Sequence, residues 1–160
     1  MPVEDTEEAK RKIDEWMKGR KIFIREKESD EAHFQFEGLT ETQIGITIAQ
    51  PKKLFRSIVV ISKLELHPKH QEALNRLNSK RKAEFIWDLK KDLIFAPATF
   101  IMEPSGEDLK SIQFMKEISF DELTEGRLIE AMDNVCRCLI CVAWALVRKF
   151  GQPTEESHLG

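Results

Sequence analysis

The residues with the most obvious chemical potential are three cysteines, Cys136, Cys138 and Cys141. The last two form a C-x-x-C spacing, which redox and zinc sites use. In redox proteins this motif lies at a helix N-terminus, where the helix dipole lowers the thiol pKa. Here it lies in an apolar run in the middle of an expected helix, and no histidine or fourth cysteine is near enough to complete a tetrahedral zinc site. We therefore interpret the cysteines as buried, inert side chains that pack as small hydrophobes.

Two histidines in the segment His67-Pro-Lys-His70 could offer imidazole ligands to a metal ion. No carboxylate stands at a convincing spacing to join them. Both histidines lie where an expected strand gives way to a helix, and we interpret them as solvated loop residues. The sequence therefore predicts neither a metal site nor a cofactor.

Two basic clusters could contact phosphate groups if the fold brought them together. The clusters are Lys52, Lys53 and Arg56, and Lys80, Arg81 and Lys82. The first lies in a link between two expected strands, where lysines commonly protect sheet edges. The second is followed by Glu84 and Asp88, so its helix is mixed in charge. Because no series of exposed aromatic residues is interleaved for base stacking, nucleic-acid binding is the alternative and not the leading interpretation.

The remaining sequence contains no catalytic motif: no P-loop, dinucleotide-binding glycine pattern, nucleophile elbow or zinc-protease motif. We therefore expect no enzyme activity. The net charge of −3 argues against a protein that coats nucleic acid. The N-terminus lacks the basic and apolar regions of a secretory signal, and the longest apolar run, residues 138–147, has about half the length that a membrane span needs. An odd number of cysteines fits a reducing compartment, so we expect a cytoplasmic protein without membrane contact.

Apolar periodicity divides the chain into blocks of helices and strands. The expected helices are residues 7–18, 69–93 and 125–150, and the second breaks at Asn78-Ser79 into two consecutive or sharply kinked helices. The expected strands are residues 22–27, 33–37, 44–50, 57–66, 98–102 and 112–120. Because short links join the first four strands, they imply an antiparallel meander.

These elements predict an α+β fold in the order α-ββββ-α(α)-ββ-α, with helices packed on an antiparallel sheet of about five to six strands. The chain has 160 residues, of which 41% are hydrophobic and 33% charged, a composition typical of one globular domain. We expect this domain to span residues 1–151, followed by a flexible C-terminal tail, residues 152–160. Trp16 and Phe85 are the expected anchors of the core.

Several segments carry a resemblance to a known family. They are Ile13-Asp-Glu-Trp16, Phe34-Gln-Phe36, Ile44-Gly-Ile-Thr-Ile-Ala-Gln-Pro51 and Arg81-Lys-Ala-Glu-Phe-Ile-Trp-Asp-Leu89. Over residues 7–150 the chain resembles an uncharacterised, mostly archaeal domain-of-unknown-function family, whose fold is similar to the type III secretion chaperones. In those chaperones the fold forms homodimers that hold an extended, partly unfolded segment of another protein, so the resemblance implies this mode of action. An archaeal relative would lack the secretion system, which implies a different client.

Apolar residues beyond those needed for a core indicate a partner surface. The stripe expected to face the sheet from the last helix consists of Leu128, Met132, Val135, Leu139, Val142 and Leu146. On the opposite side of this helix lie Ile140, Cys141 and Trp144. Trp87 and Ile94 likewise point about 100° or more away from the core stripe of their helix. We interpret these five residues as a protein interface, with packing inside the same chain as the alternative.

The leading hypothesis is a non-enzymatic, chaperone- or adaptor-like module that acts as a homodimer and binds an extended segment of another protein. The alternative is a nucleic-acid-associated protein that uses the basic clusters at residues 52–56 and 80–82. A third hypothesis is an unrecognised enzyme, which would require a deep pocket with converging titratable groups.

Overall fold

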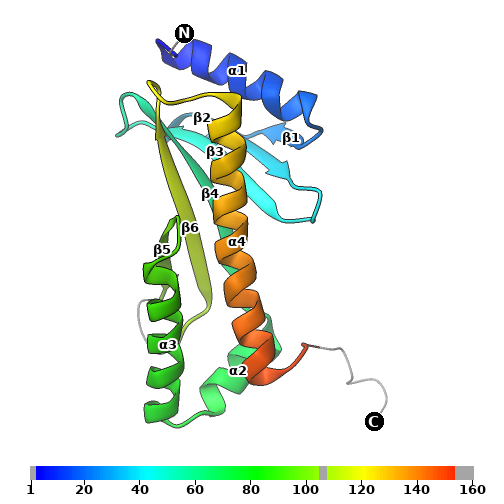
Figure 1. Ribbon diagram of the computed structural model, residues 1–160, viewed down its shortest axis with the longest axis vertical. Coiled ribbons are helices and arrows are strands. Elements are labelled where there is room, and N and C mark those ends of the chain that lie inside the picture. Colours follow the sequence, from blue (N-terminus) through cyan, green and yellow to red (C-terminus); the bar gives the residue numbers. More distant parts are fainter. Residues whose placement is uncertain (1–2, 105–107, 154–160) are drawn as a thin grey trace.

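The computed structural model describes residues 3–104 and 108–153. In this part of the chain the helices are α1 (Thr6–Gly19), α2 (Pro68–Arg76), α3 (Ser79–Ile94) and α4 (Glu125–Phe150). The strands are β1 (Phe23–Glu26), β2 (Ala32–Leu39), β3 (Gly45–Pro51), β4 (Ser57–Glu65), β5 (Thr99–Glu103) and β6 (Ser111–Ser119). The order and the α+β class are those predicted (Figure 1).

Short polar side chains fix where the helices begin. Asp5, Asn78 and Thr124 each accept a hydrogen bond from the backbone N–H three residues later, at 2.8, 2.9 and 3.1 Å. Such caps satisfy N–H groups that have no partner within the helix. The cap at Asn78 follows an extended Leu77, so α2 and α3 are two helices and not one kinked helix.

Within residues 3–104 and 108–153 the sheet has six antiparallel strands in the order β1-β2-β3-β4-β6-β5. The predicted meander is therefore present in the first four strands. The chain then passes through α2 and α3 before β5 and β6, and it is β6 that pairs with β4. As a result β1 and β5 form the two edges of the sheet.

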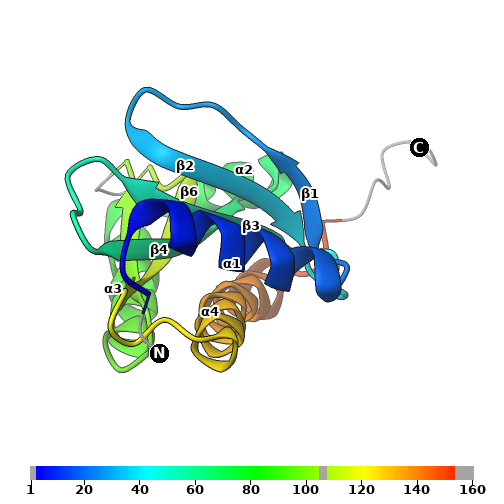
Figure 2. The ribbon, with the colours of Figure 1, turned by 90° about the horizontal axis from the view of Figure 1, so that it is seen from above.

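The core lies between one face of the sheet and the helices α1 and α4. Figure 2 shows both helices on the same side of the sheet, and α4 packs along β4 and β6 while α1 packs over β2. Alternate strand residues point to this side and are buried: Phe34, Phe36, Ile46, Ile48, Ile58, Val60, Ile112 and Phe114. This alternation follows from the two-residue period of a strand, and it leaves the opposite face of the sheet open.

Of the two expected core anchors, Phe85 is buried but Trp16 is only partly buried. The buried face of α1 consists of Ala9, Ile13 and Met17, and Trp16 lies at its margin. Because a single side of α1 rests on the sheet, the helix can bury only a narrow stripe. Phe36, Phe114 and Phe120 are the largest fully buried side chains instead.

Most of the expected tail lies outside the described residues, which end at residue 153. The segment Pro104-Ser-Gly106 is typical of a turn between the last two strands, and its residues 105–106 also lie outside the described part. In the described part of the chain, no helix combines the length and apolar character needed to cross a membrane.

Candidate protein-binding surfaces

The three cysteines of α4 differ in their surroundings. Cys136 and Cys138 are buried, whereas Cys141 is exposed. Burial raises the pKa of the Cys136 and Cys138 thiols above the ordinary value of 9.0, and the charge of Asp133 adds to the effect at Cys136. The prediction of buried cysteines is wrong for Cys141, because this residue points about 60° around the helix from Cys138 and away from the face that the sheet covers.

The interpretation of both histidines as solvated loop residues is wrong for His70, which is buried. Its Nε2–H donates to the carbonyl oxygen of Gly151 at 2.9 Å, so it joins α2 to the end of α4. His67 is exposed, but its Nδ1 accepts a hydrogen bond from the Lys69 N–H at 3.1 Å and caps α2. Among the residues that the structure describes, no three His, Cys, Asp or Glu side chains gather closely enough to hold a metal ion.

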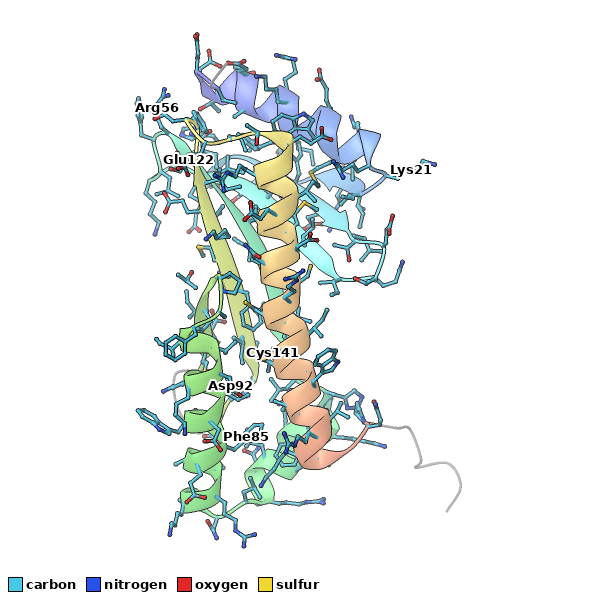
Figure 3. All side chains as sticks on the ribbon, in the orientation of Figure 1. Lys21, Arg56, Phe85, Asp92, Glu122 and Cys141 are labelled. Atoms are coloured by element: carbon cyan, nitrogen blue, oxygen red, sulfur yellow. The ribbon has the colours of Figure 1, made fainter. Side chains whose placement is uncertain are left out.

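The fold does not bring the two basic clusters together. The cluster of Lys52, Lys53 and Arg56 follows β3, and Figure 3 places Arg56 at one end of the long axis. The cluster of residues 80–82 begins α3, which starts at the opposite end, beside α2 (Figure 1). A single phosphate-binding surface containing both clusters is therefore not present.

Two of the basic side chains are also bound to acidic groups of the same chain. Arg56 lies 3.2 Å from Asp121 and donates to the backbone oxygen of Glu4 at 2.8 Å. Lys82 lies 3.5 Å from Asp108, and only 12% of its side chain is exposed. Arg56 and Lys82 are thus engaged by partners within the same chain, and these contacts compete with any contact to phosphate.

The outer side of α4 carries the first candidate binding surface, which we call the α4 patch. It consists of Ile140, Cys141 and Trp144. Trp144 is 72% exposed, Cys141 is exposed and Ile140 is partly exposed. Figure 3 shows Cys141 on the outer side of the helix. An exposed tryptophan with apolar neighbours is typical of residues that dominate the energy of protein interfaces.

The second candidate surface is the outer side of α3 together with β5, which we call the α3–β5 patch. It consists of Trp87, Ile94, Phe95 and Ile101, which are 62%, 67%, 91% and 50% exposed. Sequence reasoning identified Trp87 and Ile94 but missed Phe95 and Ile101. Phe95 follows the last residue of the helix, outside its periodic pattern. Ile101 lies on a strand whose alternation does not reveal which face is covered.

The two patches do not form one continuous surface. Phe85 and Leu89 of α3 face Ala145 of α4 across a cleft of about 560 Å³, and Figure 3 shows Phe85 between the two helices. Trp87 lies roughly 160° around α3 from Leu89, and Trp144 lies roughly 100° around α4 from Ala145. Both tryptophans therefore point out of the cleft, on different sides of the helix pair. The five predicted interface residues are split into two groups.

A groove of about 740 Å³ lies on the open face of the sheet. Apolar side chains from β3, β4 and β6 line it, namely Ala49, Val59, Ile61 and Met115. Lys52, Lys53 and Lys63 also line it, together with Asp30 and Glu31.

The sequence of residues 9–146 matches a family described as an uncharacterized conserved protein, DUF2299. The chain belongs to this family. No curated protein matches its sequence. An uncharacterized protein from Methanothermobacter thermautotrophicus has a similar crystal structure, with a TM-score of 0.85 at 26% sequence identity over 89% of this chain and 99% of that chain. The predicted resemblance to an uncharacterised family with archaeal members is confirmed.

The fold is also similar to that of a type III secretion chaperone. SycH from Yersinia pestis, solved in complex with a stable fragment of YscM2, gives a TM-score of 0.52 at 6% identity. The similarity covers 82% of this chain and 96% of that chain. At this identity it shows a shared fold, and the predicted chaperone-like fold class is confirmed.

Proposed function

We propose that this protein is a non-enzymatic, homodimeric binding module that holds an extended segment of another protein, in the manner of a chaperone or adaptor. The observation that carries the proposal is the exposure of large apolar side chains on the outer sides of α3 and α4, where no core needs them. The shared fold with SycH, a chaperone solved with a fragment of another protein, supports it. A reducing cytoplasm suits this role because it keeps the exposed thiol of Cys141 reduced.

The division of the apolar residues into two patches suggests two partners. We assign the α4 patch to the client segment, because Trp144 and Ile140 offer an apolar contact surface along one helix. The α3–β5 patch then remains available for the second copy of the chain. The acidic and basic groups around both patches would keep the free protein soluble.

The test is an aggregation assay. Light scattering would follow a chemically unfolded model protein after dilution from denaturant, with and without an excess of this protein. We expect the wild type to suppress scattering, and Trp144→Asp to lose most of this effect while remaining dimeric in gel filtration with light scattering. Asn134→Asp is the matched control, since it adds the same charge to the same helix about two turns before Cys141.

Several outcomes would count against the proposal. A wild type that leaves the scattering unchanged removes the holding function. A Trp144→Asp variant as effective as the wild type removes the α4 patch as the client surface. A monomeric Trp144→Asp variant would show that α4 binds the second copy instead.

A further inference from the structure

The two edges of the sheet differ in how they are protected against pairing with another strand. Strand β1 has four residues, a register shift between Phe23 and Arg25, and two charged residues at its end. Arg25 and Glu26 are fixed by ion pairs with Glu37 and Lys10, at 2.6 and 2.8 Å. Short length, bulges and charge are the usual means of blocking an edge. The β1 edge is therefore guarded, that is, protected against pairing with a strand of another chain.

Strand β5 is only one residue longer than β1, but its first four residues carry no charge and its ladder has no register shift. Its sequence, Thr99-Phe-Ile-Met-Glu103, contains no lysine, arginine or proline, and its pairing with β6 runs without a register shift. Ile101 is 50% exposed. Among the residues described, no segment pairs with the other side of β5. An apolar and regular edge of this kind is a template for a further strand.

The hydrogen bonds of β5 show which of its backbone groups are available. The carbonyl oxygen of Glu103 accepts from the Lys110 N–H at 2.9 Å, so this carbonyl points to the side of β6, and backbone groups two residues apart on a strand point the same way. Thr99, Ile101 and Glu103 therefore turn their backbone groups toward β6. Because these groups alternate in direction along a strand, the N–H and C=O groups of Phe100 and Met102 point to the free edge.

We propose that the second copy of this chain binds here, through antiparallel pairing of β5 with β5 of the partner about a twofold axis at Ile101. This inference rests on the homodimer of the proposed function. Phe100 would exchange hydrogen bonds with Met102 of the other copy, and Thr99 would stand opposite Glu103, so no like charges meet. The same patch then serves both copies, as a twofold interface requires.

The side chains around β5 fit this arrangement. Ile101 would meet its own copy across the axis in a non-hydrogen-bonded pair, where the Cα atoms are about 4.5 Å apart. Ile94 lines a groove with Thr99 and Phe100, so the end of α3 lies beside the strand that pairs. Trp87 stands on the same side of α3 as Ile94, because seven residues make about two turns. Pairing would therefore bring exposed apolar surface from α3 next to the partner.

The first experiment compares Ile101→Lys with Ile24→Lys by gel filtration with light scattering. Ile24 is 56% exposed on the guarded β1 edge, so the control makes the same change at similar exposure on the other edge. We expect a dimer for the wild type and for Ile24→Lys. Ile101→Lys should raise the dissociation constant by on the order of 100-fold, because the axis places both new charges opposite each other.

The second experiment gives a direct geometric readout and covers the case in which Ile101→Lys misfolds. In a Cys141→Ser background, Ile101→Cys should form a disulfide-linked dimer on mild oxidation, because the Cα separation at the axis lies in the range that a disulfide spans. Ile24→Cys should not. A wild-type dimer that persists in Ile101→Lys and gives no cross-link through Ile101→Cys would overturn the β5 pairing and leave the proposed function standing. A monomeric wild type would overturn the homodimer itself.

Discussion

At the scale of single residues, the surroundings of each thiol decide its chemistry. Cys136 and Cys138 are buried in the core and their pKa values are raised, so they are poor nucleophiles at neutral pH. Cys141 is exposed on the outer side of the same helix. Helix periodicity agrees with this difference, because it places Cys141 opposite the core stripe of α4, together with Ile140 and Trp144.

We predict that an alkylating reagent at neutral pH modifies Cys141 alone in the folded protein. Mass spectrometry of the intact protein should show one adduct, and peptide mapping should place it on Cys141. Denatured protein is the control and should carry three adducts, one for each cysteine. Rapid labelling of Cys136 or Cys138 in the folded protein would show that α4 does not pack on the sheet as described.

Glu37 provides a second prediction at the residue scale. A hydrogen bond from Arg25, at 2.6 Å, lowers the pKa of the Glu37 carboxyl below its ordinary value of 4.5. A lowered folded-state pKa adds stability above the unfolded value and loses it as the pH falls through the folded value. We expect Glu37→Gln to lose at most about 1 kcal/mol at pH 7, with the loss shrinking as the pH falls below 4.5.

Urea unfolding of both proteins at several pH values would measure this difference. Glu15→Gln is the control, since Glu15 pairs with Arg11 at a more exposed position on α1. A difference between wild type and Glu37→Gln that stays constant from neutral to acidic pH would contradict the assigned role of the ion pair.

At the scale of elements, the contact between α1 and the β1–β2 pair depends on a glycine. A Cβ atom at Gly38 would lie 2.8 Å from Met17 Cε and 3.0 Å from the backbone oxygen of Ile22. The methionine end can move, but the backbone oxygen cannot move without shifting the chain that leads from α1 into β1. The close approach of α1 to the sheet therefore requires the absence of a side chain at this position.

We predict that Gly38→Ala lowers the free energy of unfolding by about 1–3 kcal/mol. Gly45→Ala is the matched control, because Gly45 begins the neighbouring strand β3 and a Cβ there meets nothing within 4 Å. Chemical denaturation would compare the two variants. Equal stability of both would show that α1 adjusts its position freely.

At the scale of the whole molecule, the two apolar patches lie on different sides of the α3–α4 pair. One side can therefore be covered by a second copy while the other remains open to a client. The long axis of the molecule separates α1 at one end from α2 at the other (Figure 1), and α4 runs between the two ends. At the α2 end, His70 Nε2–H donates to the carbonyl oxygen of Gly151 at 2.9 Å and so connects α2 to the end of α4.

A homodimer makes thermal stability depend on protein concentration, because dissociation accompanies unfolding. We expect the Tm of the wild type to rise over about a 100-fold increase in protomer concentration. The Tm of Ile101→Lys should be lower and nearly constant over the same range. Calorimetry or circular dichroism would measure both. A wild-type Tm that does not change with concentration would contradict the dimer.

Much of the fold could be predicted from local sequence. Thr124 marks the start of α4 because its hydroxyl caps the Arg127 N–H, and the alternation of Phe34 and Phe36 marks the covered face of β2. The pairing of β4 with β6 could not be predicted in this way, because the two strands are separated by two helices and another strand. For the same reason, the sequence did not reveal that β5 is an edge.

The candidate surfaces could likewise be predicted only in part from the sequence. The sequence by itself determined that Trp87, Ile94 and Trp144 lie off the core stripes, because helix periodicity fixes which residues share a face. It did not determine that Cys141 is exposed, that His70 is buried or that the basic clusters lie apart. Only the tertiary structure decided these points, because exposure and proximity depend on which distant segments pack together. That packing places Trp144 and Trp87 on separate surfaces and leaves β5 as the unguarded edge.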